Sequence, residues 1–429
     1  MQRKILLVGA SLNSGNRGVN ALTRGTINAL IDYYKRVDIR ILSYTVKERI
    51  SNSICVNGVN VIIDEIPCRG YESLMVCMLC YLKNVFPRNI FQYIIKKYNH
   101  IYKELANADL ILDLSEGDSF SDIYGIKRFI VHSTIKISTF KLKKKIFLLP
   151  QTIGPFNFFF VKKAAAYILK NVNHCFVRDL ISYEVVSKQI GIIKNKISYA
   201  PDMAFYMKPN PQVSISDIYK NLDSQQSCII GVNVSGLLYN GGYTQNNMFN
   251  LLVDYKELMY QIVSSLLLKN ENTKILFIPH VISQENPIED DLTACKCIYD
   301  MFDDKYTNRF FLLNKAYSED KLKSIIGECD FFIGARMHAC IGAISMYIPT
   351  VPIAYSRKFL GIWEQFDLGE CIADPRVNSL EDILGIVESC FKKKDKIKQK
   401  LLIKMEGVSN EILNVFKKID DYSTELLTM

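Results

Sequence analysis

The chain has 429 residues, of which 49% are hydrophobic and 23% charged, and this balance excludes a disordered or fibrous protein. The length exceeds one ordinary core and suits two domains of about 200 residues each. The formal net charge of +9 favours anionic partners such as phosphorylated small molecules or anionic lipid headgroups. We expect no nucleic-acid partner, because no sequence motif for nucleic-acid binding accompanies this charge.

The N-terminal segment and the most apolar segment of the chain both predict a protein of the cytoplasm. The apolar run after Lys4 stops at Gly9, too soon for a cleavable signal. The most apolar segment, residues 74–82, is far shorter than the roughly 20 residues of a membrane span. Peripheral contact with the inner face of the cytoplasmic membrane is compatible with the basic charge.

The twelve cysteines do not predict a disulfide framework. Many of them lie in apolar segments, where cysteine acts as a small hydrophobic residue. The close pairs Cys77/Cys80 and Cys295/Cys297 do not match the spacing of structural zinc ligands. We therefore expect no metal site.

Predicted strands and helices alternate through the first half of the chain. Apolar segments predict strands at 4–10, 37–44, 59–65, 108–114, 144–150, 174–179 and 196–202. Helices are predicted at 21–34, through most of 71–106, near 158–171 and near 181–190. Strands that are apolar throughout and separated by helices are typical of a parallel sheet covered on both faces.

A polar segment at 207–227, with Pro209 and Pro211, predicts a linker before a second α/β series. This series has predicted strands at 228–236, 274–280, 310–315, 330–335 and 350–355. The expected fold is α/β, with two doubly wound, Rossmann-like domains at 1–206 and 228–378 that face each other across a cleft. A basic helical tail is expected at 379–429, and its run KKKDKIKQK at 392–400 is interpreted as a solvated face rather than a lipid-binding one.

A glycine-containing loop, GASLNSGNRGVNAL at 9–22, connects the first predicted strand to the first helix. Glycines let the backbone approach an anion or a sugar closely, and a helix that follows offers unbonded N–H groups. The loop matches no known phosphate-binding motif, so a tight turn without a ligand explains the glycines equally well. Arg17 and Asn20 favour a ligand-binding loop, in which Asn16 is a further candidate.

Charged side chains also follow the later strands of the first half. Glu116 and Asp118 come after the strand at 108–114, where carboxylates could act as bases, bind sugar hydroxyls or cap a helix. Arg178 ends the strand at 174–179, and a buried arginine there needs an anion, or an ion pair with Asp179 or Glu184. Asp202 follows the last strand before the linker.

In the second half, the segment GARMHACIGAI at 334–344 places Arg336 and His338 between an apolar strand and an apolar helix. A helix N-terminus favours an anion, arginine can form a forked contact with phosphate or carboxylate, and histidine can move a proton near neutral pH. Lys358 follows the strand at 350–355. His280 ends another strand, a place where a lone histidine is more often a structural hydrogen-bonding residue.

The ordered motifs of the chain resemble those of the polysaccharide pyruvyl transferase family, over about residues 3–370. The motifs are GNRGVNAL, LSEGDSFSDIYG, LPQTIGPF, VRDLISYE, APDMAF, GVNVSG, IPHV and GARMHACIGA. The most specific part is G-x-R-x-H-x-x-I-x-A together with the upstream IGPF and PD. The chain departs from the family at Glu116, where members often have a second glycine, and the loop around Asn16 and Arg17 also varies.

The resemblance implies a fold like that of two-domain GT-B glycosyltransferases. It also implies transfer of the enolpyruvyl unit of phosphoenolpyruvate to two hydroxyls of a sugar, giving a pyruvate ketal in a capsular or other exopolysaccharide or in its lipid-linked precursor. Phosphoenolpyruvate is the expected donor substrate, and no metal or other cofactor is expected. The resemblance carries phosphoenolpyruvate contacts over to Arg178, Arg336 and His338.

On this basis each candidate residue receives a hypothetical role. Arg178, Arg336 and Lys358 would clamp phosphate and carboxylate, and His338 would bind phosphate and act as the acid. The sugar hydroxyls would be oriented or deprotonated by Asp202, Glu116 or Asp118, with Asn16, Arg17 and His280 as further substrate contacts. Two alternatives stay open, a GT-B glycosyltransferase that uses a nucleotide sugar and a non-catalytic binding protein of a polysaccharide operon.

Overall fold

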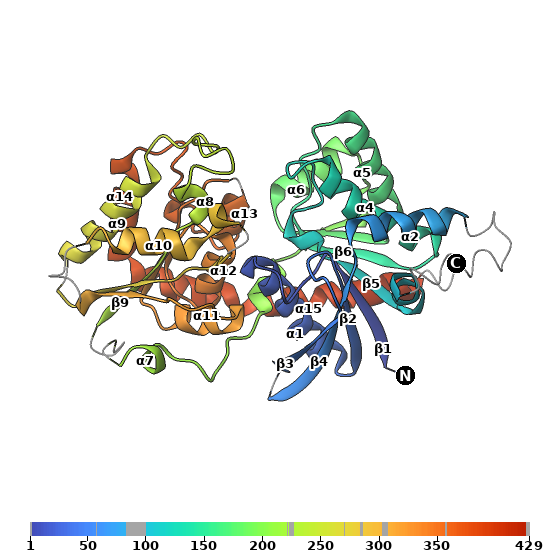
Figure 1. Ribbon diagram of the computed structural model, residues 1–429, viewed down its shortest axis with the longest axis horizontal. Coiled ribbons are helices and arrows are strands. Elements are labelled where there is room, and N and C mark those ends of the chain that lie inside the picture. The colour runs from blue at the N-terminus through green and yellow to red at the C-terminus, as the bar shows by residue number, and fades with distance from the viewer. Residues whose placement is uncertain are drawn as a thin grey trace. The chain divides into compact units, whose positions relative to one another are not determined.

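The computed structural model describes residues 2–56, 58–82, 100–220, 222, 227–269, 271–283, 286–302, 308–356 and 358–425. The chain divides into two compact units (Figure 1). Unit 1 comprises residues 1–14, 22–207 and 409–429, and unit 2 comprises residues 15–21 and 208–408. Most of the expected linker at 207–227 therefore groups with unit 2, although some of it lies outside the described residues.

Unit 1 is built on an eight-stranded sheet in the order β3-β4-β2-β1-β5-β6-β7-β8. Its strands are β1 (Arg3–Val8), β2 (Val37–Ser43), β3 (Ile50–Val56), β4 (Val59–Pro67), β5 (Leu110–Asp113), β6 (Ile146–Gln151), β7 (His174–Val177) and β8 (Ile197–Tyr199). All neighbouring strands are parallel except the antiparallel pair β3–β4. The order reverses between β1 and β5, which is the place where doubly wound sheets bind ligands.

The sequence analysis predicts no strand at 50–56, where the structure has β3. This edge strand alternates between exposed and more buried residues and carries the polar run Ser51-Asn52-Ser53. Edge strands with one solvated face lack the continuous apolar run that marks the central strands. The prediction missed β3 because it relied on that run.

Helices cover both faces of the unit 1 sheet. They are α1 (Arg17–Tyr34), α2 (Gly70–Leu82), α4 (Ile126–Lys141), α5 (Phe159–Asn171) and α6 (Leu180–Glu184), with short turns η1 (Ser115–Gly117), η2 (Val185–Gln189), η3 (Lys194–Lys196) and η4 (Met203–Tyr206). α2, α4 and α5 lie on one face, and α1 lies on the other (Figure 1). The predicted helix through 71–106 falls partly outside the described residues.

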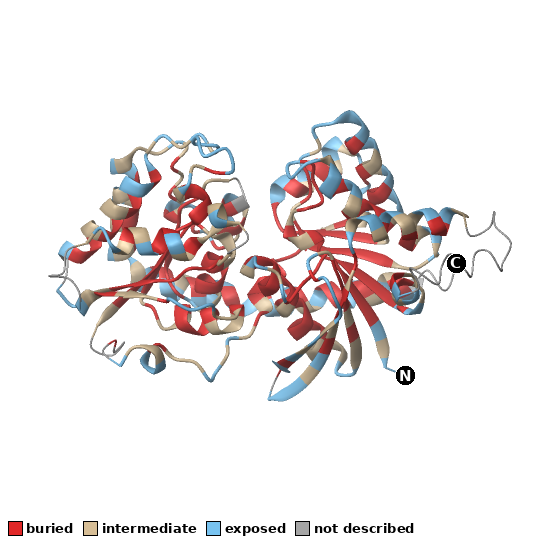
Figure 2. Ribbon diagram, viewed as in Figure 1, coloured by how far each residue is buried: buried red, intermediate tan, exposed pale blue. Residues whose placement is uncertain are grey.

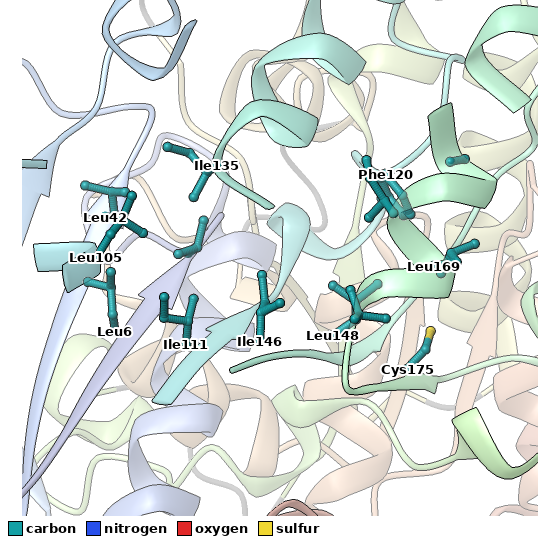
Figure 3. Packing of buried hydrophobic residues seen from close by; sticks show 14 of the residues in the cluster. Leu6, Leu42, Leu105, Ile111, Phe120, Ile135, Ile146, Leu148, Leu169 and Cys175 are labelled. Carbon is teal, nitrogen blue, oxygen red and sulfur yellow. The ribbon is translucent and has the colours of Figure 1, made fainter. Parts of the chain in front are cut away.

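The core under α2, α4 and α5 joins side chains of the strands to side chains of the helices and loops. Leu6, Ile111 and Leu148 of the sheet pack with Ile135 of α4 and Leu169 of α5 (Figure 3). The central strands β5, β6 and β7 are buried along their whole length (Figure 2). Burial on both faces explains why these strands are mostly apolar, with polar side chains only at their ends.

Unit 2 has a five-stranded, fully parallel sheet in the order β11-β10-β9-β12-β13. Its strands are β9 (Cys228–Asn233), β10 (Thr273–Phe277), β11 (Phe310–Leu312), β12 (Phe331–Gly334) and β13 (Thr350–Pro352). Its helices are α7 (Ile215–Ile218), α8 (Gly236–Tyr239), α9 (Tyr255–Lys269), α10 (Asp291–Tyr299), α11 (Glu319–Gly327), α12 (Met337–Ser345), α13 (Lys358–Gln365) and α14 (Leu380–Lys392), with turns η5 (Pro287–Glu289) and η7 (Gly369–Cys371). Here the strand order reverses between β9 and β12.

The helical tail expected at 379–429 is shared by the two units. α14 and the first part of α15 (Lys394–Glu425) group with unit 2, whereas residues 409–425 of α15 group with unit 1. In unit 1, Phe416 of α15 packs its ring 5.9 Å from that of Tyr33 in α1. Among the described residues, the structure has no helix that combines the length and the apolar character of a membrane span.

Candidate functional site

A buried carboxylate, Asp291, joins three strand ends of unit 2. Its Oδ2 accepts hydrogen bonds from the backbone N–H groups of His280 (3.2 Å) and Val281 (3.0 Å), which follow β10. Its Oδ1 accepts from the N–H of Gly236 after β9 (2.9 Å). Because Asp291 is fully buried, these bonds fix the loops that follow β9 and β10 against each other.

The third strand is β12, and Arg336, which follows it, connects its end to Asp291. Its Nε and one terminal nitrogen donate to Oδ1 of Asp291 at 3.0 and 2.8 Å, a forked ion pair. Its backbone N–H donates to Oδ1 of Asn233 at the end of β9 (3.0 Å). Burial alone would lower the pKa of Arg336, but the charge and hydrogen bonds of Asp291 raise it above its usual value. Arg336 therefore stays cationic, with its side chain only 11% exposed.

The start of α1 and the two residues before it belong to this end of unit 2. The helix begins at Arg17, four residues earlier than predicted, so Arg17 lies in its first turn. Residues 15–21 group with unit 2, and Asn16 forms a β-bridge with Val281. The Arg17 guanidinium lies 4.0 Å from the carboxylate of Glu319. Gly18 packs against His338, since a Cβ added at Gly18 would lie 2.4 Å from the imidazole Nδ1. The predicted candidates Asn16, Arg17 and His338 thus share one region.

Cationic groups surround a neutral histidine in this region. Burial lowers the pKa of His280 well below its usual value, and the charges of His338, Arg336 and Arg17 lower it further. These positive side chains lie at the strand ends, next to a helix N-terminus, where a small anion with more than one negative charge would share the two arginines with Asp291 and Glu319. Among the described residues, no group of three or more histidine, cysteine, aspartate or glutamate side chains could hold a metal ion.

In unit 1, Arg178 and Asp202 form a buried ion pair. One terminal nitrogen of Arg178 lies 2.6 Å from Oδ2 of Asp202, and Nε donates to the hydroxyl of Thr152 (3.0 Å). The arginine side chain is 2% exposed and the aspartate 1%. The partner of Arg178 is therefore Asp202, not the two alternatives named from sequence. Of those, Asp179 caps α6 by accepting from the N–H of Ser182, and Glu184 pairs with Lys188.

The loop after β5 is strained beside this pair. Ser115, Glu116 and Gly117 have φ values of 44°, 51° and 91°, all in the left-handed region. Glycine adopts this conformation easily, whereas serine and glutamate do so at a cost. A Cβ added at Gly117 would lie 3.4 Å from a terminal nitrogen of Arg178. A glycine at position 116, which the resemblance to the family leads us to expect, would adopt this φ without that cost.

Glu116 is held by cations rather than available as a base. Its Oε2 lies 2.5 Å from a terminal nitrogen of Arg128 and 3.4 Å from Nε2 of His132. Burial would raise the pKa of Glu116, but the hydrogen bond and charge of His132 and the charge of Arg128 lower it to about 2. A carboxylate with this pKa is a weak proton acceptor near neutral pH. Asp118 lies in the same loop and accepts from the hydroxyl of Tyr124 (2.8 Å).

Several residues of these networks have no counterpart among the sequence candidates. They are Asp291 in unit 2, and Arg128 and His132 in unit 1. Asp291 sits in the segment IEDDLTA, where an acidic pair before a helix indicates a cap, and Asp290 is indeed the N-cap of α10. Lys358 is the first residue of α13, and its side chain lies outside the described part of the structure.

Solved structures of other proteins define the class of fold. A glycosyltransferase from Rickettsia africae matches with a TM-score of 0.56 and 14% identity, covering 99% of both chains. An alpha,alpha-trehalose 6-phosphate synthase from Burkholderia multivorans matches with a TM-score of 0.57 and 11% identity, covering 100% of this chain and 98% of that one. A UDP-N-acetylglucosamine 2-epimerase gives a TM-score of 0.57 at 10% identity, over 98% and 96% of the chains. With two Rossmann-like units, the chain has the GT-B fold.

Sequence comparison identifies the family within this class. Residues 16–357 match the family described as polysaccharide pyruvyl transferase, and the chain belongs to that family. The chain is also 22% identical over 419 residues to the amylovoran biosynthesis protein AmsJ of Erwinia amylovora, covering 93% of this chain and 94% of AmsJ. The resemblance found in the sequence motifs is confirmed.

Proposed function

We propose that this protein transfers the enolpyruvyl group of phosphoenolpyruvate to two hydroxyls of a sugar, forming a pyruvate ketal. The acceptor is a cell-surface polysaccharide or its lipid-linked precursor. Family membership supports pyruvyl transfer, and the similarity to a protein of amylovoran biosynthesis supports an exopolysaccharide acceptor.

The observation that carries the donor assignment is the cationic group in unit 2. Arg336 is the N-cap residue of α12, His338 lies in the first turn of this helix, and Gly18, which follows Arg17, packs against the His338 imidazole. Phosphoenolpyruvate carries a phosphate and a carboxylate on adjacent positions, so it needs more than one cation in a small volume. We assign Arg336 and Arg17 to these anionic groups, and Arg178 remains a proposed contact in unit 1.

The chemistry requires a proton donor and positioned hydroxyls. Protonation of the methylene carbon makes the neighbouring carbon electrophilic, and the first sugar hydroxyl attacks that carbon. The bond from this carbon to the phosphate oxygen then breaks, inorganic phosphate leaves, and the second hydroxyl closes the ring. Of the two hydroxyl protons, one replaces the proton consumed at the methyl carbon and the other leaves with phosphate. We assign the donated proton to His338.

Asp202 receives a positioning role in this proposal. Its Oδ2 binds Arg178, and its Oδ1 accepts from the N–H of Ala204 (2.8 Å). A carboxylate engaged on both oxygens suits holding Arg178 in place better than removing a proton. Replacement of Asp202 by asparagine should therefore raise KM for phosphoenolpyruvate more than it lowers kcat.

The test is acceptor-dependent phosphate release from phosphoenolpyruvate, measured with acceptors that contain galactose, mannose or N-acetylhexosamine. The Arg336→Ala and His338→Ala variants should lose about 100-fold or more in kcat/KM, the effect of removing a group that stabilises developing charge. Arg376→Ala is the matched control, because Arg376 also forms a forked pair with an aspartate, Asp374, outside the candidate site. Full turnover by Arg336→Ala would refute the donor assignment.

The second candidate is transfer from a nucleotide sugar, since the same cations could bind a diphosphate. Thermal shift separates the two, because a ligand that binds only the folded protein raises the melting temperature. Stabilisation by phosphoenolpyruvate but not by nucleotide sugars is expected. Stabilisation by a nucleotide sugar alone, without phosphate release, would favour the glycosyltransferase.

A further inference from the structure

Exposed apolar side chains gather on unit 1 beyond the carboxyl ends of its strands. We call them the aromatic rim: Tyr124, Phe158, Phe159, Phe160, Leu180 and Ile181. Phe159 is 72% exposed, Leu180 60% and Phe160 55%. Their segments follow β5, β6 and β7, and α4, α5 and α6 appear together on the upper side of unit 1 in Figure 1. Single exposed apolar residues are ordinary, but a group of large ones marks an interaction surface.

Buried polar contacts hold the rim in shape. The carboxylate of Asp122 accepts from the backbone N–H groups of Asn157 (2.6 Å) and Phe158 (3.0 Å), which ties the segment after β5 to the start of α5. The hydroxyl of Ser182 accepts from the N–H of Ile153 (2.9 Å), which ties α6 to the segment after β6. The rim is thus fixed by the fold, and its exposure is not the result of a loose loop.

The rim carries positive charge among its rings. Lys162 and Lys163 are exposed on α5, a helix that has no acidic residue. The ammonium of Lys163 lies 4.4 Å from the ring centre of Phe159, and the Arg128 guanidinium lies 5.1 Å from that of Tyr124. Of the nearby carboxylates, that of Asp122 is buried and used by the backbone, and Asp118 accepts from the hydroxyl of Tyr124. Glu116 pairs with Arg128, and Glu184 pairs with Lys188. Among the described residues, the unpaired positive charge of the rim therefore comes from Lys162 and Lys163.

We propose that the aromatic rim rests on the surface of an anionic lipid bilayer. Aromatic and branched side chains enter the boundary between headgroups and acyl chains, while lysines extend their ammonium groups to anionic headgroups. The strand ends that carry Arg178 and Asp202 lie on the same edge of the unit 1 sheet. The inference deepens the proposed function, because a lipid-linked acceptor would then be met at the membrane, but its test involves no turnover.

A second exposed apolar face provides a comparison. On α2, Tyr71, Leu74, Met78 and Tyr81 are exposed, and the helix itself carries one charged residue, Glu72. The exposed Lys141 of α4 lies 4.1 Å from the ring centre of Tyr81, so this face has one lysine against one carboxylate. An anionic surface attracts lysines and repels carboxylates, so charge favours the rim over the α2 face.

The test is sedimentation of the full-length protein with vesicles of phosphatidylcholine, with and without phosphatidylglycerol. Binding should need phosphatidylglycerol and weaken as salt is added. The double variant Phe159→Ser/Phe160→Ser should lower the partition coefficient about tenfold or more, since large apolar side chains no longer enter the boundary. Lys162→Gln/Lys163→Gln should lower it about tenfold, with less remaining salt dependence.

Matched controls show whether a loss of vesicle binding is specific to the rim or follows from removing any exposed apolar side chain. Leu268→Ser removes a 79% exposed leucine of unit 2 and should bind as the wild type does. Leu74→Ser/Met78→Ser on the α2 face should also keep its binding. Phosphate release with a soluble acceptor should be unchanged in the Phe159→Ser/Phe160→Ser variant, so failure of the proposed function and failure of membrane binding appear in different assays.

Other results overturn the inference. The first is that the wild type does not bind phosphatidylglycerol vesicles. The second is that the α2 variant loses as much vesicle binding as the rim variant. The third is that the wild type binds no vesicles but forms a concentration-dependent dimer in light scattering, which the Phe159→Ser/Phe160→Ser variant does not form. The last result would assign the rim to a second copy of the chain.

Discussion

At the residue scale, Gly18 is a position where a single methyl group should separate activity from stability. A Cβ at Gly18 would lie 2.4 Å from Nδ1 of His338 and 3.0 Å from Oδ1 of Asn16, so one of them must move. Gly18→Ala should therefore displace the imidazole and lower kcat about tenfold or more, the scale of a misplaced acid. Phosphate release and a thermal melt of the same sample check this.

Gly15→Ala is the control for that substitution. Gly15 lies two residues before α1, in which Gly18 is the second residue, and an added Cβ at Gly15 would meet no atom within 4 Å. It should keep both its activity and its melting temperature. If Gly18→Ala were as active as Gly15→Ala, turnover would not depend on the present position of the His338 imidazole.

His174 should make the stability of unit 1 depend on pH. Burial lowers its pKa to about 4, and the charges of Lys418 and Lys196 contribute. Between pH 6.5 and about 4 the unfolded chain binds a proton that the folded protein does not. The contribution of His174 to stability is therefore fully present above pH 6.5 and is lost as the pH falls through this window.

Urea unfolding at a series of pH values checks this expectation. His174→Gln keeps a polar side chain that can reach the hydroxyl of Ser198, which lies 2.9 Å from the imidazole Nε2. The variant should lose less stability than the wild type between pH 7 and 5. Parallel curves for the two proteins would show that His174 does not titrate differently on folding.

The sequence was sufficient to select several candidate site residues, but not to predict which residues they contact. Arg178 and Asp202 could be singled out because a charge at the end of an apolar strand needs a partner, and the structure joins them at 2.6 Å. Asp291 could not, because its contacts come from the ends of β9, β10 and β12, and strand order decides which of these ends meet. The sequence of a carboxylate before a helix is the same whether the side chain caps that helix or connects the loops at the ends of several strands.

At the element scale, a fully buried ion pair connects β5 to α4. The ammonium of Lys136 lies 3.0 Å from the carboxylate of Asp113, and both side chains are 0% exposed. It also donates to the hydroxyl of Ser115 (2.9 Å), the first residue of the left-handed turn. Lys136→Met removes one partner and leaves a buried carboxylate, so it should cost about 3–5 kcal/mol of unfolding free energy.

A double variant shows whether the cost comes from the unpaired charge. Asp113→Asn/Lys136→Met removes both charges and should be more stable than Lys136→Met alone. Chemical denaturation of the two variants and the wild type gives the comparison. A double variant that is less stable than the single one would mean that Asp113 has a further role at the loop.

The same element shows how far sequence patterns reach. An apolar run predicted β5, and the acidic residues after it predicted a functional or capping loop. The sequence LSEGDSF does not predict the positive φ values of Ser115 and Glu116. Of the three residues in the turn 115–117, only Gly117 is a glycine. The strain follows from tertiary contacts, namely the backbone N–H of Glu116 donating to Gly9 and Lys136 reaching Ser115.

At the scale of the whole molecule, the alternation of strands and helices was enough to predict two doubly wound sheets. The solved GT-B structures confirm this fold class at 14% identity or less in the matches described above. The pattern did not reveal that residues 15–21 group with unit 2 or that α15 is shared by both units. Those features depend on contacts between segments that are far apart in the chain, which periodicity does not encode.

The shared helices have a consequence for exchanging parts between relatives. A hybrid gene joined once, at the linker near 207, would combine unit 2 of one parent with segment 15–21, which contains the start of α1, from the other. It would also place a foreign end of α15 against α1 of unit 1. Exchange of whole units between relatives therefore calls for a mosaic with junctions near 14, 21, 207 and 408, so that each unit keeps all of its own segments.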